Sequence, residues 1–207
     1  MSFVHSPSTS FILYANDNYH SHVVHFLLTE KNLPHQRYLV ADETEIAELN
    51  PYATLPILVG RDIVLYESNV IFEYLEERYA TNKLLPETPA QRAAMRLLAW
   101  RLQKDWLSLG QILLTHPDSF DDTSAKHAKK TLTDSLLTLD PLFARYEFFM
   151  SHNFGWCDVL LLPLLYRLPM MGIVLPKPLC PALIDYQRRL FSRPSFQKTL
   201  NTGVIYD

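Results

Sequence analysis

The chain has 207 residues, a length that accommodates one large domain or two small ones around a buried core. Hydrophobic residues make up 48% of it and charged residues 20%, which excludes a disordered or linker-dominated chain. The net charge is −3, but residues 1–82 hold four basic and eleven acidic residues, whereas residues 83–207 hold fifteen and eleven. This asymmetry predicts two lobes with different surfaces. Neither is basic enough to indicate direct sequence-specific DNA binding.

Glycine and cysteine usage excludes several kinds of site. The five glycines lie far apart, so no phosphate-binding loop can form. Cys157 and Cys180 have no second cysteine pair, which argues against a zinc framework or a disulfide scaffold and fits a reduced, cytoplasmic environment. The N-terminus lacks a signal pattern, and the most apolar stretch, residues 159–176, contains Arg167 and three prolines. We therefore expect no membrane span.

The first eighty residues predict the element order βαβαββα. Short apolar runs indicate strands, apolar residues at helical spacing indicate helices, and a tight turn at residues 60–62 predicts a hairpin. The predicted elements are a strand at 11–14, a helix ending at 31–32, a strand at 36–40, a short acidic helix at 43–49, strands at 57–59 and 63–65, and a helix at 67–79.

Everything after this unit is predicted to be helical. The apolar patterns place helices at about 86–114, at 125–143, from residue 155 onward and at about 182–191. Gly155 is expected to be the N-cap of the third helix, with Asp158 at the third helical position. The domain boundary is expected within residues 80–87, which gives an N-terminal domain of residues 1–82 and an all-α domain of residues 83–207.

Two residue pairs at the ends of the hairpin carry a resemblance to glutathione transferases: Leu55-Pro56 precedes it and Glu67-Ser68 follows it. The resemblance implies a thioredoxin-like α/β domain followed by an all-α domain. It also implies that a cis proline offers its backbone to the peptide part of glutathione. The Glu-Ser pair, at a helix N-terminus, would then bind the γ-glutamyl carboxylate. The alternative is purely architectural: a turn at Pro56 and a helix cap at Ser68.

Within that superfamily the chain more closely resembles the stringent starvation protein A family of bacterial RNA polymerase cofactors. The matching segments are Tyr19-His20-Ser21-His22, residues 65–68, 73–78, Pro86 to Arg92, Lys104-Asp105-Trp106 and residues 163–169. This resemblance implies a cytoplasmic dimer that regulates transcription under stress or starvation by binding RNA polymerase holoenzyme, including its sigma factor. It further implies that the protein has no transferase activity and no cofactor.

The same resemblance predicts a partner-binding surface near the domain boundary. The family carries a Pro-His-Pro segment, part of its polymerase contact, where this chain has Ala80-Thr81-Asn82. That segment therefore differs here, while the residues that flank it remain. The predicted partner-binding residues are Ala80, Thr81, Asn82, Lys83, Leu84, Pro86, Arg92, Lys104 and Asp105.

No catalytic residue is predicted, although one alternative stays open. A transferase needs a donor that stabilises the glutathione thiolate. Tyr14 can serve in an active or glutathione-binding transferase, or it can simply pack at the end of its strand. Asp17 would repel a thiolate, and Ser21 lies about one helical turn late. A third possibility is a ligand sensor that keeps Pro56 and the Glu67-Ser68 pair without turnover.

His20, His22 and His25 have a spacing that invites a metal assignment. His22 and His25 can share a helix face, but His20 projects elsewhere, and no neighbouring Cys or carboxylate completes a tetrahedral site. We therefore predict no metal site. Trp100, Trp106 and the Met170-Met171 pair are expected in the core or at an interface, and the methionines can also form an adaptable contact surface.

Overall fold

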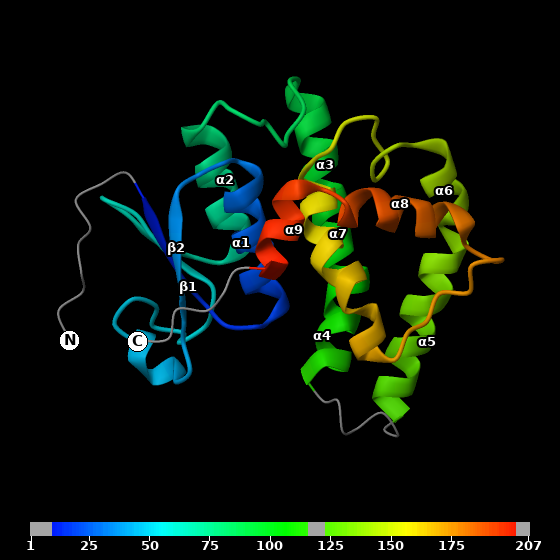
Figure 1. The fold of residues 1–207 in the computed structure, drawn as a ribbon, viewed down its shortest axis with the longest axis horizontal. Coiled ribbons are helices and arrows are strands. Elements are labelled where there is room, and N and C mark those ends of the chain that lie inside the picture. The colour runs from blue at the N-terminus through cyan, green and yellow to red at the C-terminus, as the bar shows by residue number, and fades with distance from the viewer. Residues whose placement is uncertain (1–9, 116–122, 202–207) are drawn as a thin grey trace. The chain divides into compact units, whose positions relative to one another are not determined.

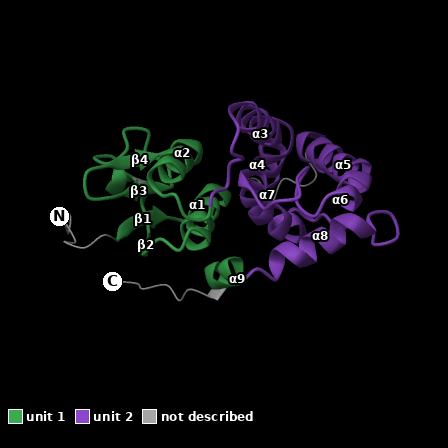
Figure 2. Ribbon diagram, turned by 90° about the horizontal axis from the view of Figure 1, so that it is seen from above, with its two compact units in different colours: residues 1–82, 194–207 green, residues 83–193 purple. Residues whose placement is uncertain are grey.

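The computed structural model describes residues 10–115 and 123–201, which form two compact units (Figures 1 and 2). Unit 1 contains residues 1–82 and 194–207, and unit 2 contains residues 83–193. None of the helices in the described ranges has both the length and the apolar character needed to cross a membrane.

Unit 1 is built on a four-stranded sheet with the order β2-β1-β3-β4. β1 and β2 are parallel, while β3 is antiparallel to both β1 and β4. Its elements up to residue 82 are β1 (Phe11–Ala15), α1 (Tyr19–Glu30), β2 (His35–Leu39), the 3-10 helix η1 (Glu43–Ile46), β3 (Ile57–Val59), β4 (Val64–Tyr66) and α2 (Ser68–Arg78). The predicted order βαβαββα is confirmed.

Strand periodicity explains how β1 contributes to two layers. Phe11 and Leu13 are fully buried, whereas Tyr14 is half-buried, because successive side chains point to opposite faces of the sheet. On the second face Tyr14 packs against a small cluster that includes Ile46 of η1 and Ile57 of β3. The β1 side chains are thus held by packing on both faces of the sheet.

The last described helix, α9 (Pro194–Asn201), also belongs to unit 1. Phe196 packs edge-to-face on Phe26 of α1 with ring centroids 5.4 Å apart, and His22 Nε2 lies 2.9 Å from Thr199 Oγ1. The structure therefore differs from the predicted division, which placed all residues after 82 in one helical domain. The reason is a long-range contact: α9 buries its apolar face against α1.

A buried ion pair fixes the end of unit 1. Lys31 Nζ lies 2.8 Å from Glu76 Oε2, and the two side chains are 0% and 5% exposed. Lys31 also donates to the carbonyl oxygens of Thr81 and Asn82 at 3.4 and 3.2 Å. Asn82 has a left-handed φ of 49° and donates from Nδ2 to the Glu30 carbonyl at 2.9 Å. These bonds hold the residues that replace the family's Pro-His-Pro segment.

Unit 2 is helical and is organised around α7, in which every residue except Tyr166 is buried. Its elements are α3 (Pro89–Leu102), the π-helix η2 (Gln103–Leu107), α4 (Ser108–Thr115), α5 (Thr123–Thr138), α6 (Asp140–Arg145), α7 (Trp156–Arg167), the 3-10 helix η4 (Leu168–Met171) and α8 (Pro181–Phe191). The helix predicted for residues 125–143 is interrupted after Thr138. Pro141 has no backbone N–H to continue the α5 hydrogen bonds, and it instead occupies the first turn of α6.

The predicted start of α7 at Gly155 is confirmed. Asp158 Oδ2 accepts a hydrogen bond from the Gly155 N–H at 2.8 Å. The other oxygen, Oδ1, accepts from the Phe149 N–H at 2.8 Å and from the Tyr186 hydroxyl at 2.6 Å. Burial, reinforced by Asp158, holds the pKa of Tyr186 well above its ordinary value, so that its hydroxyl keeps the proton it donates.

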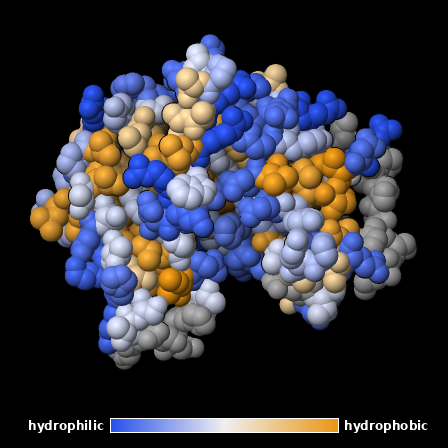
Figure 3. Space-filling model, turned by 180° about the vertical axis from the view of Figure 1, so that it is seen from behind, coloured by the Kyte–Doolittle hydropathy of each residue, from blue (hydrophilic) through white to orange (hydrophobic). Residues whose placement is uncertain are grey.

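Several large apolar side chains remain exposed in both units. They include Tyr52, Val64 and Val70 in unit 1, and Leu97, Trp100, Met150, Met170, Val174 and Leu179 in unit 2. On the face shown in Figure 3, hydrophobic residues gather in separate groups bordered by hydrophilic ones. Exposed apolar groups of this kind are candidates for contact surfaces.

Candidate functional site

The four residues predicted to form a glutathione site lie at one end of the β3–β4 hairpin. Ile57 pairs with Tyr66 in the antiparallel register, so the chain entering β3 and the chain leaving β4 are neighbours. The structure thus brings together Leu55, Pro56, Glu67 and Ser68. The Leu55–Pro56 peptide bond is cis, as the resemblance implies.

The junction between β4 and α2 has an unusual backbone and an unsatisfied hydroxyl. Glu67 has φ 77° and ψ 118°, outside the regions that non-glycine residues ordinarily occupy. Ser68 is 3% exposed, and its Oγ has no hydrogen-bond partner among the described residues. It therefore does not cap α2. An unpaired buried hydroxyl costs about 1–3 kcal/mol. Strained backbone angles and unpaired buried polar groups of this kind cluster at binding sites.

The chemistry of this junction suits a carboxylate. The N-terminal end of α2 carries the positive end of the helix dipole, and its first turn contains no acidic residue. Backbone amides and the Ser68 hydroxyl can donate to a carboxylate there. The charge of Glu67 at this junction also affects His20. Burial lowers the pKa of His20, and the negative charge of Glu67 opposes that shift. The γ-glutamyl carboxylate of glutathione, which the resemblance implies as the ligand here, stays a prediction.

The three candidate residues for thiolate chemistry are engaged or unsuitable. Tyr14 stacks on Tyr38 with ring centroids 5.8 Å apart, and burial followed by Tyr38 raises the pKa of its phenol. Ser21 Oγ donates to Asn16 Oδ1 at 3.1 Å and accepts from the Asn16 N–H at 3.2 Å. Asp17 is exposed. A phenol with a raised pKa is a weaker hydrogen-bond donor, so this arrangement does little to stabilise a thiolate.

The three histidines of α1 have separate partners. His20 packs edge-to-face on Tyr19 with ring centroids 5.1 Å apart. His22 contacts Thr199 and stacks on Phe196, whereas His25 Nδ1 lies 3.2 Å from the Arg37 guanidinium. Burial, then His35 and Arg37, lower the pKa of His25 to about 3, so this ring is neutral at pH 7. Within residues 10–115 and 123–201, no group of three His, Cys, Asp or Glu side chains is placed to hold a metal ion.

A second candidate site is a pocket of about 1020 Å³ within unit 2, beside α3 and the loop before α7. Its apolar lining comprises Leu84, Leu85, Pro86, Ala94, Met95, Leu97, Leu98, Phe149, Met150 and Phe154. Its polar lining comprises Lys83, Glu87, Thr88, Gln91, Arg101, Ser151 and Asn153. An apolar floor with a few convergent polar groups is typical of a binding pocket.

Hydrogen bonds fix the loop that frames this pocket. The Leu84 carbonyl accepts from the Trp156 N–H at 3.1 Å, and Arg92 Nε donates to the Pro86 carbonyl at 2.8 Å. Leu84 is only 3% exposed. It therefore anchors the loop while it also lines the pocket, and half-buried Arg92 positions Pro86. The contact role that the resemblance implies for Leu84 stays a prediction.

The other predicted partner-binding residues are divided between the two units. Lys83 and Pro86 line the pocket, but Lys104 and Asp105 are exposed on the π-helix and do not line it. Ala80, Thr81 and Asn82 are exposed at the end of unit 1. The sequence analysis missed the lining residues Met95, Leu98, Arg101, Phe149 and Met150. For Phe149 and Met150 the sequence offers only the short apolar run at 148–150, which has no periodicity of its own.

Comparisons with known proteins identify the family and the fold of the chain. Residues 20–78 match the glutathione S-transferase N-terminal domain model, and residues 101–194 match the C-terminal domain model. The solved structure of glutathione S-transferase III in its apo form superposes with a TM-score of 0.80 at 24% identity, covering 96% of this chain and 99% of that one. Glutathione S-transferase GstB of Escherichia coli strain K12 is 28% identical, covering 86% of this chain and 90% of its own.

Relatives named stringent starvation protein A homolog have a higher sequence identity to this chain than GstB has. The stringent starvation protein A homolog of Coxiella burnetii is 36% identical over 185 residues, covering 88% of this chain and 87% of its own. Identity at this level over nearly the whole of both chains, together with the matching domain models, settles the assignment. The chain belongs to the stringent starvation protein A family and has the glutathione transferase fold.

Proposed function

We propose that this protein is a cytoplasmic, non-enzymatic regulator of transcription under stress or starvation, which acts by binding RNA polymerase holoenzyme, including its sigma factor. The observation that carries the proposal is the unit 2 pocket, whose apolar floor is framed by the anchored loop at Pro86 and bordered by Lys83 and Arg101. A loop that hydrogen bonds already hold in place loses little conformational entropy when a partner binds. The net charge of −3 favours a protein partner over independent DNA binding.

Charge and size changes at the pocket should weaken binding to purified RNA polymerase holoenzyme. Met150 is 46% exposed and lines the pocket, as does Arg101. In surface plasmon resonance, we expect Met150→Glu and Arg101→Glu each to raise the dissociation constant by about tenfold, a loss of about 1.4 kcal/mol. Their thermal melts should be nearly unchanged, because exposed substitutions shift stability little.

Lys104→Glu is the matched control for this experiment. It makes the same charge change three residues further along the chain, outside the pocket. If Lys104→Glu weakens polymerase binding as much as Arg101→Glu does, the polymerase contact lies on the exposed helix surface and not in the pocket. Full binding by both pocket variants would refute the assignment of the pocket.

Ligand binding at the α2 N-terminus is the second candidate function, favoured by the unpaired Ser68 hydroxyl. Even if glutathione binds there, we expect no conjugation to an electrophilic aromatic substrate above the uncatalysed rate. Burial raises the pKa of the Tyr14 phenol, which makes this phenol a weaker hydrogen-bond donor to a thiolate. Steady-state kinetics test this, with calorimetry on Ser68→Ala reporting binding separately. Robust turnover that disappears in Tyr14→Phe would establish an active transferase.

We further propose a homodimer. Exposed Val64 and Val70 lie on β4 and α2, and exposed Leu97 and Trp100 lie on α3, so a two-fold arrangement can cover both apolar groups in each chain. Light scattering at micromolar concentration should give twice the chain mass of 24.0 kDa. Trp100, 55% exposed, is the test position, and we expect Trp100→Glu to dissociate the dimer. A monomeric wild-type protein would contradict the proposal.

A further inference from the structure

Two histidines and one arginine meet where α1 packs against strand β2. His25 lies on α1, whereas His35 and Arg37 lie two residues apart on β2, so their side chains point to the same face of the sheet. The His25 and His35 ring centroids are 5.3 Å apart, and Arg37 Nη1 lies 3.2 Å from His25 Nδ1. His25 is 3% exposed, and the other two side chains are half-buried. Three basic groups therefore share one partly enclosed site.

The hydrogen bonds of this cluster define where its protons lie. A guanidinium has only donors, so His25 Nδ1 accepts the Arg37 N–H and carries no proton of its own. The Leu33 carbonyl can only accept, so His35 Nδ1, 2.8 Å from it, carries a proton. Protonation of His25 at Nδ1 would turn two donors toward each other beside the Arg37 charge. The bond between Arg37 and His25 therefore exists only while the His25 ring is neutral.

No acid balances the cluster within residues 10–115 and 123–201: no carboxylate there pairs with His25, His35 or Arg37. The other titratable groups of the elements packed around α1 and β2 have their own partners, are exposed, or lie on the opposite face of the sheet. They are His20 and His22 of α1, Glu30 of α1, which bonds to Ser195 of α9, exposed Lys198 of α9, Glu76 of α2, which pairs with Lys31, and Tyr14 of β1. A proton added to the cluster therefore meets only positive charge.

Acid acts against the folded form of this site. Burial, then His35 and Arg37, lower the pKa of His25 from 6.5 to about 3. Burial is also the largest influence on His35 and lowers its pKa, with the Leu33 carbonyl opposing and Arg37 reinforcing that shift. A histidine whose pKa is lower in the folded state stabilises that state fully above about pH 6.5 and loses this contribution as the pH falls. The cluster therefore weakens progressively below neutral pH.

β2 is the element that this weakening should release first. It is an edge strand, since the sheet has the order β2-β1-β3-β4, and none of its five residues is fully buried. α1 has further support, because Phe26 packs on Phe196 of α9 and the buried Lys31 pairs with Glu76 of α2. Local opening begins in segments that bury few apolar groups.

We infer that His25, His35 and Arg37 form an acid-sensitive latch, which holds β2 against α1 at neutral pH and releases β2 when the two rings take up protons. The effect extends along the chain, because β2 leads into η1, whose Ile46 packs with Leu55 beside the cis proline. Moderate acid is thus expected to loosen this part of unit 1 while unit 2 stays folded.

Hydrogen exchange of the full-length protein, corrected for the intrinsic effect of pH on exchange, tests the latch. Between pH 7 and pH 5 we expect the protection factors of residues 35–40 to fall by about tenfold or more, because each proton taken up on opening favours the open state as the pH falls. Protection of α7 should change by less than about twofold. Nitrogen NMR of the His25 ring should show the neutral form until β2 opens.

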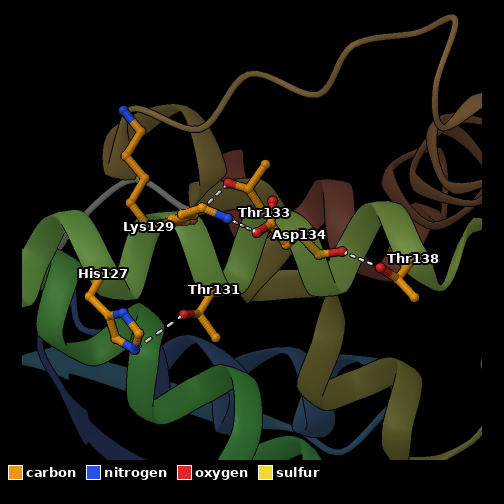
Figure 4. Close-up of polar contacts among 7 residues, drawn as sticks. His127, Lys129, Thr131, Thr133, Asp134 and Thr138 are labelled. Atoms are coloured by element: carbon orange, nitrogen blue, oxygen red, sulfur yellow. Dashed lines mark hydrogen bonds and ion pairs between the residues drawn. The ribbon is translucent and has the colours of Figure 1, made fainter.

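Two variants remove the titrating rings, and a third is the control. His25→Asn keeps an acceptor near the Nδ1 position but cannot be protonated, so most of the acid response should disappear. His35→Asn, at a half-buried position that tolerates replacement better, keeps a donor toward the Leu33 carbonyl and should weaken the response. His127 is exposed on α5 of unit 2, where its ring lies 3.5 Å from Thr131 (Figure 4). His127→Asn removes a histidine without altering unit 1 and should leave the response intact.

The latch is refuted if β2 keeps its protection at pH 5, or if α7 loses protection in parallel, which would indicate global acid unfolding. It is also refuted if both asparagine variants of the cluster respond to acid as the wild-type protein does. A response that disappears in His22→Asn and persists in His25→Asn would place the titrating group at the contact of α1 with α9, and this too would overturn the inference.

Discussion

Lys31→Met should lower the free energy of unfolding by about 3–5 kcal/mol, because it leaves the Glu76 carboxylate buried without its cation. The Lys31 side chain is completely buried, and its ammonium also donates to the carbonyls of Thr81 and Asn82. The substitution therefore removes the donor that holds these two carbonyls as well. Urea unfolding followed by circular dichroism measures the loss. Faster hydrogen exchange at residues 79–82 would report the release of this segment.

The double variant Lys31→Met/Glu76→Leu is the control. It removes both charges and fills the site with apolar groups, so most of the lost stability should return. Hydrogen exchange at residues 79–82 should nevertheless stay fast, because the carbonyls still lack the Lys31 donor. A loss below about 1 kcal/mol in the single variant would mean that the pair behaves like an exposed salt bridge, which would contradict the proposed role.

Asp158→Ala should destabilise unit 2 by about 3–5 kcal/mol. The carboxylate accepts hydrogen bonds from two backbone N–H groups, those of Phe149 and Gly155, and from the Tyr186 hydroxyl. Each buried donor left without a partner costs about 1–3 kcal/mol. The same bonds hold the loop before α7, which contributes Phe149 to the pocket. Thermal melting and polymerase binding should therefore both be impaired.

Tyr186→Phe separates the hydroxyl from the rest of this network. In the Asp158→Ala background the hydroxyl has already lost its acceptor, so Tyr186→Phe should cost less there than in the wild-type protein. Strictly additive losses in the double-mutant cycle would show that the two residues act independently. Restoring a hydroxyl at the N-cap by Gly155→Ser should not rescue Asp158→Ala, since its Cβ would lie 2.9 Å from Met95 Cε and 3.1 Å from the Leu84 carbonyl.

Local patterns in the sequence were sufficient for the elements of unit 1 up to residue 82 and for the start of α7. Short apolar runs and apolar residues at helical spacing predicted the order βαβαββα, because buried strands are short and apolar and burial of one helix face imposes a period of 3.6. The acceptor Asp158 three residues after Gly155 predicted the N-terminus of α7, since that spacing lets a carboxylate reach the N-cap amide. The resemblance to glutathione transferases implied the cis Leu55–Pro56 bond, and the hairpin brings this bond close to the Glu67-Ser68 pair.

The remaining features depend on contacts between residues that are distant in the sequence. Nothing local to Phe196 indicates that α9 packs on Phe26, and nothing around Lys31 indicates an ion pair with Glu76 or bonds to Asn82. The pocket likewise combines α3 with the loop at 148–154, and the Leu84 carbonyl accepts a hydrogen bond from the distant Trp156 N–H. Periodicity records which face of an element is buried, but only the tertiary structure decides what covers that face, because packing partners are chosen by shape and distance in space.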